Sequence, residues 1–141
     1  MRSTKVHTNY AIRKSRPGLG HGLFATHRVT KHEFIIEYTG TKVPNKVADV
    51  MKTRYLFELD DEWTIDGSDR SNIARYINHA CDPNCESEIH DGHILILATR
   101  DIEAGEEILM DYGQEYFDEF IRPIGCKCTS CALGRAIVVA V

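Results

Sequence analysis

Two short segments contain the residues of this sequence that are best suited to chemistry. The first, residues 75–85, reads RYINHACDPNC and contains Asn78 and His79; the second, residues 105–113, reads GEEILMDYG and contains Tyr112. A tyrosine ring can form an apolar wall while its hydroxyl orients or stabilises a polar group. A tyrosine beside Asp-Gly is usually a turn or core residue, and a lone histidine is usually a hydrogen-bonded loop residue. The pairing of the two segments favours a functional site instead.

In this order and at this distance, the two segments resemble the signature of SET-domain protein lysine methyltransferases. The resemblance extends from about Ser15 to Gly134. It implies a mostly β fold of small sheets with short helices, and a knot-like crossing in which the segment ending at Tyr112 passes under a preceding loop. It also implies a protein-lysine N-methyltransferase that uses S-adenosylmethionine. We expect a SET domain over residues 12–114 and a post-SET flap with the C-terminal tail over 115–141, without a pre-SET cysteine cluster.

Methyl transfer from a sulfonium to a lysine is an in-line displacement, so the site must align donor and amine and favour the neutral amine. A free lysine has a pKa near 10.4, and an apolar site beside a positive charge lowers it. The resemblance assigns the catalytic role to Tyr112 and places Tyr55 between the donor and the lysine channel. For Tyr55, an ordinary aromatic residue on a strand remains the alternative.

Residues that would contact the donor follow from the same resemblance. Arg75 either stabilises the Asn-His loop or binds the donor carboxylate, and the sequence leaves both roles open. The glycines in residues 18–25 (GLGHGLFA) allow a close approach of backbone to donor, but no parallel βαβ unit supports a Rossmann loop. The predicted donor contacts are Leu19, Gly20, His21, Tyr55, Arg75, Asn78, His79, Tyr112 and Lys127.

The cysteines favour metal binding. Five is an odd number, and three of them crowd into residues 126–131, which favours metal ligation over a disulfide framework and indicates a reducing compartment. By resemblance to the post-SET element, one structural Zn²⁺ would have four thiolate ligands. These are Cys81, Cys126, Cys128 and Cys131. Free or redox-active thiols are the alternative, and Cys85 is expected to be a small buried residue.

Three positions depart from the family pattern. The Cys-x-Cys-x2-Cys spacing is two residues shorter than usual, which affects the expected zinc geometry. Met110 stands two residues before the catalytic tyrosine, where Phe or Tyr is common and is linked to product multiplicity. Arg70 stands where several relatives have another active-site tyrosine. The sequence therefore leaves the number of methyl groups open.

The elements that must position these residues are mostly strands. Apolar blocks between turn signals predict strands at 22–25, 34–38, 55–59, 63–65 and 94–98, and Asp91-Gly92 predicts a hairpin over 88–96. We also expect two helical elements: a helix following Pro44 to about Lys52 and a short helical turn over 71–77. With 141 residues and 43% hydrophobic composition, the chain fits one domain.

A net charge of −4 argues against nucleic-acid binding and suits a basic partner. The longest apolar run, 136–141, is too short to cross a bilayer, so we expect a soluble intracellular protein, cytoplasmic or chromatin-associated. The expected substrate is a lysine in a protein, in a histone or another basic tail. Acidic residues could attract such a tail or could form a solvated turn, namely Glu58, Asp60, Asp61 and Glu62.

Two other function classes are alternatives for this sequence. A non-catalytic SET-like module could bind a peptide as an added edge strand. Intact Tyr112, Asn78 and His79 speak against it. A small zinc module that binds nucleic acid is disfavoured by the net charge and by a zinc set split between the middle and the end of the chain.

Overall fold

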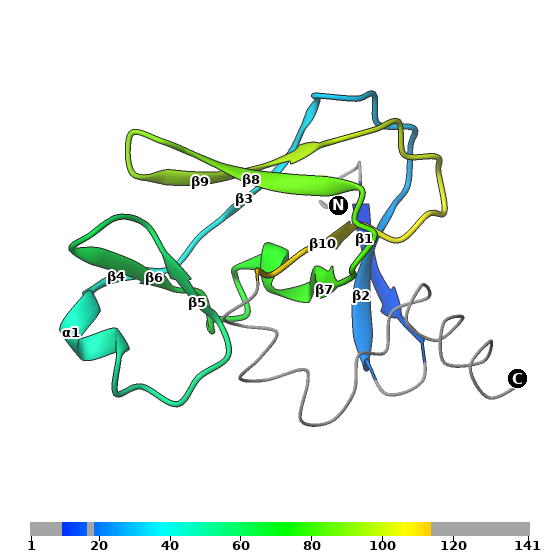
Figure 1. The fold of residues 1–141 in the computed structure, drawn as a ribbon. Helices are drawn as coiled ribbons and strands as arrows, with labels where there is room; N and C mark the ends of the chain where they lie inside the picture. Colours follow the sequence, from blue (N-terminus) through cyan, green and yellow to red (C-terminus); the bar gives the residue numbers. More distant parts are fainter. Residues whose placement is uncertain (1–9, 17–18, 114–141) are drawn as a thin grey trace, which may run out of the picture.

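The computed structural model describes residues 10–16 and 19–113 (Figure 1). This part of the chain is mostly β, as predicted, and is arranged in three sheets. Strands β1 (Tyr10–Lys14) and β2 (His21–Ala25) form an antiparallel hairpin. The five-stranded sheet has the order β3-β9-β8-β10-β7, with strands Phe34–Tyr38, His93–Ala98, Cys85–His90, Leu109–Met110 and Asn78–His79. The third sheet has the order β4-β6-β5, with strands Thr41–Pro44, Trp63–Asp66 and Leu56–Glu58.

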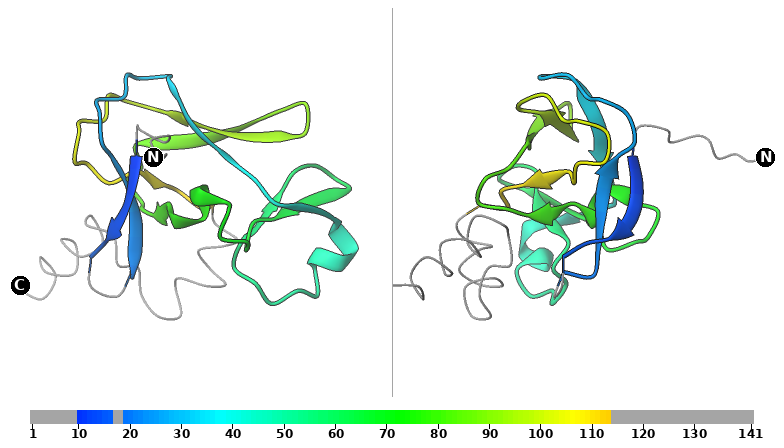
Figure 2. Two further views of the ribbon diagram at one scale, coloured as in Figure 1. Left: turned by 180° about the vertical axis from the view of Figure 1, so that it is seen from behind. Right: turned by 90° about the vertical axis from the view of Figure 1, so that its right-hand side faces the viewer.

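The two smaller sheets lie at opposite ends of the molecule. Figures 1 and 2 show the β4-β6-β5 sheet with helix α1 (Asn45–Ala48) at one end and the β1-β2 hairpin at the other. Strands β7 and β10 and the 3₁₀ helix η2 (Ile73–Tyr76) lie between them. The Asn-His pair forms β7 directly after η2, so the predicted short helical turn that leads into this pair is confirmed.

The predicted helix over 44–52 is wrong in its length. Pro44 ends β4, and α1 covers only Asn45–Ala48. A helix in a globular protein is stabilised mainly by burying one apolar face. Here Ala48 is the one buried residue of α1, while Val47 and Val50 are 46% and 74% exposed. A longer helix would therefore bury little additional apolar surface.

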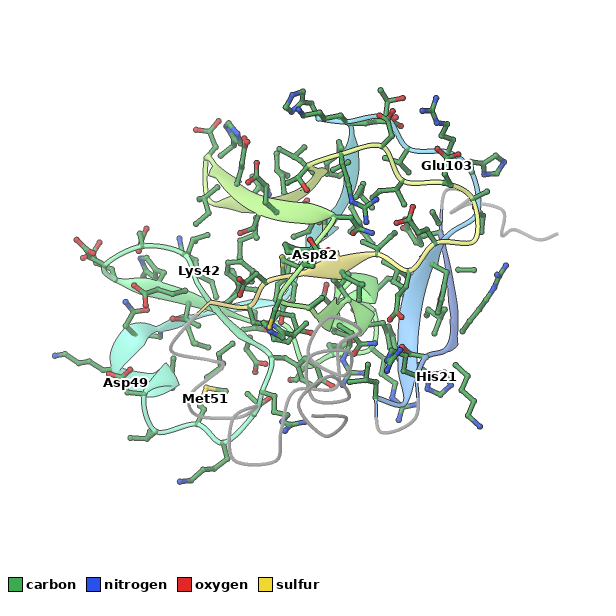
Figure 3. The ribbon with its side chains drawn as sticks, turned by 45° about the vertical axis from the view of Figure 1, so that its right-hand side comes forward. His21, Lys42, Asp49, Met51, Asp82 and Glu103 are labelled. Carbon is green, nitrogen blue, oxygen red and sulfur yellow. The ribbon has the colours of Figure 1, made fainter. Side chains whose placement is uncertain are left out.

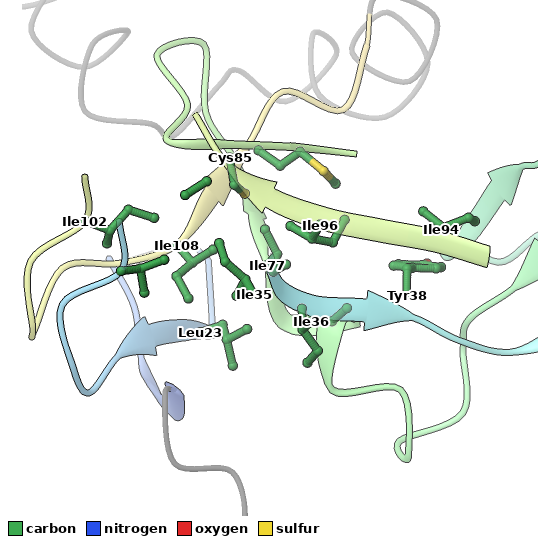
Figure 4. Close-up of a cluster of buried hydrophobic side chains, with 14 of the residues drawn as sticks. Leu23, Ile35, Ile36, Tyr38, Ile77, Cys85, Ile94, Ile96, Ile102 and Ile108 are labelled. Carbon is green, nitrogen blue, oxygen red and sulfur yellow. The ribbon is translucent and has the colours of Figure 1, made fainter. Parts of the chain in front are cut away.

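The β8-β9 hairpin forms where Asp91-Gly92 predicts it. Both turn residues have positive φ, 50° for Asp91 and 79° for Gly92, which matches the right-handed twist of the flanking strands. Ile94, Ile96 and Ala98 on β9 alternate into the core with 0–1% exposure. Figure 4 shows Ile94 beside Tyr38 of β3 and Ile96 near Ile36, with Leu23 of β2 and Ile108 before β10 in the same cluster.

The segment that leads to Tyr112 lies between two strands joined by a short loop. β10 pairs in parallel with both β7 and β8, and residues 80–84 connect those two strands across it. Asn84, which is 1% exposed, accepts a hydrogen bond from the Leu109 N–H (2.8 Å) and donates one to the Glu107 carbonyl (2.8 Å). The Ala80 N–H donates to the Met110 carbonyl (3.1 Å). The chain thus passes under its own loop, in agreement with the crossing that the resemblance implies.

Within the described ranges, no helix combines the length and the apolar character needed to traverse a lipid bilayer.

Candidate active site

A cavity of about 670 Å³ lies where β5, η2 and the end of β10 meet. Tyr55, Arg75 and Tyr112, three of the predicted site residues, all line it. Its walls also contain the apolar side chains of Phe57 and Met110. The structure thus brings residues from three separate segments to one partly apolar pocket, although they are up to 57 positions apart in the sequence.

Tyr112 is fixed at three points. Its hydroxyl donates a hydrogen bond to the carbonyl of Ile77, the C-cap residue of η2. Its backbone N–H donates to Nδ1 of His79 (3.1 Å), and the two rings meet edge to face with centroids 5.4 Å apart. Because the hydroxyl proton is donated to the Ile77 carbonyl, the phenol oxygen can act only as an acceptor toward an incoming amine.

His79 acts as a neutral support for this arrangement. It is 7% exposed, and burial lowers the pKa of its imidazole, with Asp111 opposing that shift. Since Nδ1 accepts the Tyr112 N–H, the neutral ring carries its proton on Nε2. That nitrogen lies 3.6 Å from the sulfur of Cys81.

Arg75 lies against aromatic rings on the cavity wall. Its guanidinium is 4.3 Å from the centroid of the Tyr55 ring and 5.3 Å from that of Tyr76, distances typical of cation-π contacts. One terminal nitrogen donates to the Tyr76 hydroxyl (3.4 Å). The buried Nε has no hydrogen-bond partner within the described part of the chain. Because an unpaired buried N–H is costly, this guanidinium is well suited to bind a carboxylate.

The predicted donor contacts of the N-terminal segment lie beside the Asn-His pair. The Asn78 amide donates to the His21 carbonyl (3.0 Å), which joins β7 to the start of β2. Leu19 and Gly20 form the turn before β2, and Gly20 has a positive φ of 72°. The His21 and Tyr76 rings meet edge to face with centroids 6.5 Å apart, and Figure 3 shows His21 at the end of β2 that follows the turn. The contact between β2 and β7 at His21 and Asn78 is therefore linked to the cavity through Tyr76 and Arg75.

The two described cysteines differ in their surroundings. Cys81 is exposed. Cys85 is 1% exposed, burial raises the pKa of its thiol to about 12, and it donates to the Leu109 carbonyl (3.2 Å), so the expectation of a small buried residue is confirmed. Among the described residues, no three His, Cys, Asp or Glu side chains gather closely enough to hold a metal ion. The other predicted ligands, Cys126, Cys128 and Cys131, and the donor contact Lys127, lie outside the described residues.

Of the two departures from the family pattern that lie among the described residues, Met110 is at the cavity. It is 7% exposed and lines the wall beside Tyr112. Arg70 is exposed and lies away from the cavity lining.

Three residues of the site were not singled out by the sequence analysis. Glu107 accepts a hydrogen bond from Asn78 (2.9 Å), Tyr76 supports Arg75, and Asn84 holds the crossing together. All three lie inside the two signature segments, which was the available signal, but residue type alone assigned them no role.

The crossing strand, the Asn-His pair beneath it and the tyrosine at its end define this chain as a SET domain. The SET domain family model matches residues 20–113, so the chain belongs to this family and the predicted resemblance is confirmed.

Several curated relatives share much of this sequence. A "Histone-lysine N-methyltransferase, H3 lysine-4 specific" of Emericella nidulans is 42% identical over 122 residues, 77% of this chain and 10% of that protein. The protein of the same description from Saccharomyces cerevisiae is 38% identical over 125 residues, 78% of this chain and 12% of that protein. "Histone-lysine N-methyltransferase trr" of Drosophila melanogaster is 36% identical over 135 residues, 86% of this chain and 6% of that protein. The chain thus spans about a tenth of the length of these relatives.

Proposed function

We propose that this chain is a protein-lysine N-methyltransferase that transfers methyl groups from S-adenosylmethionine to the ε-amine of a lysine. The observation that carries the proposal is the cavity of about 670 Å³ at which Tyr55, Arg75 and Tyr112 meet. The hydrogen bond between Asn78 and His21 lies next to it. Family membership and the names of the relatives support it.

The side chains of the cavity would bind and orient the amine. Tyr55, Phe57 and Met110 give it apolar walls, and a lysine entering them loses water that stabilises its charge. The guanidinium of Arg75 adds a positive charge nearby, and both effects lower the pKa of the lysine. The Tyr112 oxygen, which donates its own proton to Ile77, would accept an N–H of the neutral amine and align its lone pair.

The donor, when bound, would supply an electrophilic methyl group on a sulfonium. The proposed donor contacts are Leu19, Gly20, His21, Tyr55, Arg75, Asn78, His79, Tyr112 and Lys127. The buried Arg75 Nε without a partner in the described ranges fits the donor carboxylate, which favours donor binding over a purely structural role for Arg75. His79 would act through Tyr112, whose N–H it accepts, and Asn78 through its amide.

For the substrate, we propose a lysine in a basic tail of the histone H3 type, and therefore a place on chromatin. Two of the relatives are described as H3 lysine-4 specific. The carboxylates of Asp49, Glu58 and Asp111 at the cavity outnumber the guanidinium groups of Arg54 and Arg75 there, which suits a cationic peptide.

We propose the SET domain over residues 12–114 and the post-SET segment over 115–141.

We also propose one structural Zn²⁺ held by Cys81, Cys126, Cys128 and Cys131. The exposed position of Cys81 supports this assignment, because ligands from another segment can reach an exposed side chain. The Nε2–H of His79 at 3.6 Å is suited to stabilise a thiolate there, as groups that donate to metal ligands commonly do. The zinc would be structural, since four thiolates leave no open position for substrate.

The proposal is tested by incubating the full chain with S-adenosylmethionine and recombinant histone H3, with other lysine-rich proteins and an H3 tail peptide in parallel. Intact-mass spectrometry should show added mass in steps of one methyl group on H3, which also reads the number of methyl groups. Donor binding is measured separately by calorimetry. If the donor binds but no methyl group is transferred to any protein of the panel, the H3 assignment is contradicted. If the donor does not bind and no methyl group is transferred, the result favours a non-catalytic SET-like module.

A further inference from the structure

The carboxylate of Glu107 lies at a junction of four segments of the chain. It accepts hydrogen bonds from the Ser15 hydroxyl at 2.9 Å to each of its oxygens, and from the Asn78 amide at 2.9 Å. Ser15 follows β1, Asn78 begins β7, and Glu107 bridges Phe24 of β2 just before β10. One half-buried carboxylate thus joins the β1-β2 hairpin to the Asn-His strand.

These contacts fix the orientation of the Asn78 amide. Its nitrogen donates to the His21 carbonyl (3.0 Å) and to Glu107 Oε2 (2.9 Å), which uses both of its hydrogens. A flipped amide would direct its oxygen at two acceptors and lose both bonds. The Asn78 Oδ1 is therefore held facing away from Glu107, where it can only accept a hydrogen bond.

Gly22 provides the space for this carboxylate. A Cβ at Gly22 would collide with the Glu107 carboxylate and would lie 3.1 Å from the Asn78 amide nitrogen. By contrast, a Cβ at Gly20 would meet no atom within 4 Å, and its positive φ is the constraint at that position. The two glycines of the Gly-His-Gly run thus have different roles: Gly20 makes the turn, and Gly22 leaves room for Glu107.

We propose that Glu107 is a positioning residue for the methyl donor: it holds the Asn78 amide so that its oxygen accepts an N–H group of the donor, in space that Gly22 leaves open. This inference rests on the proposed function, because it needs Asn78 to contact the donor. It assigns no chemical step to Glu107, which acts through Asn78 alone.

A double-mutant cycle on donor affinity tests the inference. Donor Kd is measured by calorimetry for wild type, Glu107→Ala, Asn78→Ala and the double variant. Loss of the acceptor should raise Kd about tenfold in Glu107→Ala, because the freed amide can rotate and present an N–H to the donor. In the Asn78→Ala background the same change should have no further effect on Kd. Turnover at saturating donor should fall less than about threefold in Glu107→Ala, since the reacting groups are unchanged.

Controls separate positioning from a general loss of structure. Glu107→Gln retains one carbonyl acceptor for Asn78 and should restore donor Kd to within about threefold of wild type. Glu103→Ala removes an exposed carboxylate that pairs with Arg28 and should leave Kd unchanged (Figure 3). If Glu107→Ala does not fold, Gly22→Ala replaces it in the cycle, because its methyl group displaces the same carboxylate.

Unchanged donor Kd in folded Glu107→Ala, or equal effects of that change with and without Asn78, would overturn the inference. Failure of the proposed function is recognised separately, because wild type would then not bind the donor at all. In that case the amide itself is observed by NMR: the Asn78 side-chain NH₂ signals should shift and exchange faster with water in Glu107→Ala. An unaltered NH₂ pair would overturn the positioning role independently of the donor.

Discussion

At the scale of single residues, the Tyr112 hydroxyl has two roles. It donates a hydrogen bond to the Ile77 carbonyl, and in the proposed reaction its oxygen accepts an N–H of the substrate amine. Tyr112→Phe removes the acceptor for the amine while the ring keeps its edge contact with His79. We expect turnover to fall by about 10²-fold or more with donor Kd within a few-fold, as for other groups placed for a transition state. Single-turnover methyl transfer measures this, with Tyr10→Phe as a control that removes a hydroxyl outside the cavity. Equal turnover in the Tyr112 variant would contradict its catalytic role.

Cys85 illustrates how burial changes the chemistry of a side chain. Burial first, and Glu86 second, raise the pKa of its thiol to about 12, so the reactive thiolate is scarce at any ordinary pH. We expect Cys85 to remain unmodified when the folded protein is treated with iodoacetamide at pH 8, and to react once the chain is unfolded in urea. Peptide mapping by mass spectrometry reads both states. Rapid modification in the folded state would show that β8 opens easily.

At the scale of elements, the β8-β9 hairpin depends on its turn. Gly92 has a φ of 79° and open space around its Cβ position, so Gly92→Ala introduces backbone strain without a steric clash. A residue with a Cβ in this conformation costs about 1–2 kcal/mol, and the midpoint of urea unfolding should fall accordingly. Asp91→Asn is the matched control, because Asn suits positive φ at this turn position and should change stability by less than about 0.5 kcal/mol.

The same hairpin shows which elements the sequence could predict. Local signals, such as the Asp91-Gly92 pair and the alternating residues of β9, predicted the hairpin, and apolar blocks predicted β2, β3 and β6. Strands β7 and β10 have two residues each and no periodicity, and they exist because Asn78–His79 pairs with Leu109–Met110 across a long stretch of chain. The resemblance implied the crossing of the segment that ends at Tyr112, but not this strand pairing.

The site was predicted to a similar extent. Tyr112, Asn78 and His79 were assigned through the resemblance, and the structure brings them together. Glu107 was missed because a Glu-Glu pair in a sequence usually indicates a solvated turn. Its role depends on the hydroxyl of Ser15 and the space at Gly22, which only the fold brings to it.

At the scale of the whole molecule, the crossing of β10 unites segments that are far apart in sequence. Asn84→Ala would leave the part-buried Leu109 N–H and Glu107 carbonyl without the side chain that bonds both. An unsatisfied buried group costs about 1–3 kcal/mol. Because both groups are only part-buried, we expect the lower part of that range for each, and the unfolding free energy should fall by about 2–4 kcal/mol. Denaturant unfolding measures this, with Asp82→Ala, an exposed change in the same loop (Figure 3), as a control. A cost below about 0.5 kcal/mol would show that the strand pairing alone maintains the crossing.

The proposed zinc would join Cys81, in the loop that crosses β10, to the C-terminal cysteines. We expect one zinc per chain by elemental analysis of the purified protein, and its loss in Cys81→Ser, because three thiolates bind the ion more weakly than four. Cys85→Ala is the matched control, since that thiol is buried against the Leu109 carbonyl and should leave the metal content unchanged. Removal of zinc by a strong chelator should weaken donor and peptide binding and lower the melting temperature of wild type, while Cys81→Ser should be insensitive to the chelator. Equal zinc content in Cys81→Ser and wild type would exclude Cys81 from the ligand set. Full donor affinity after complete zinc removal would exclude a role for the ion in shaping the donor site.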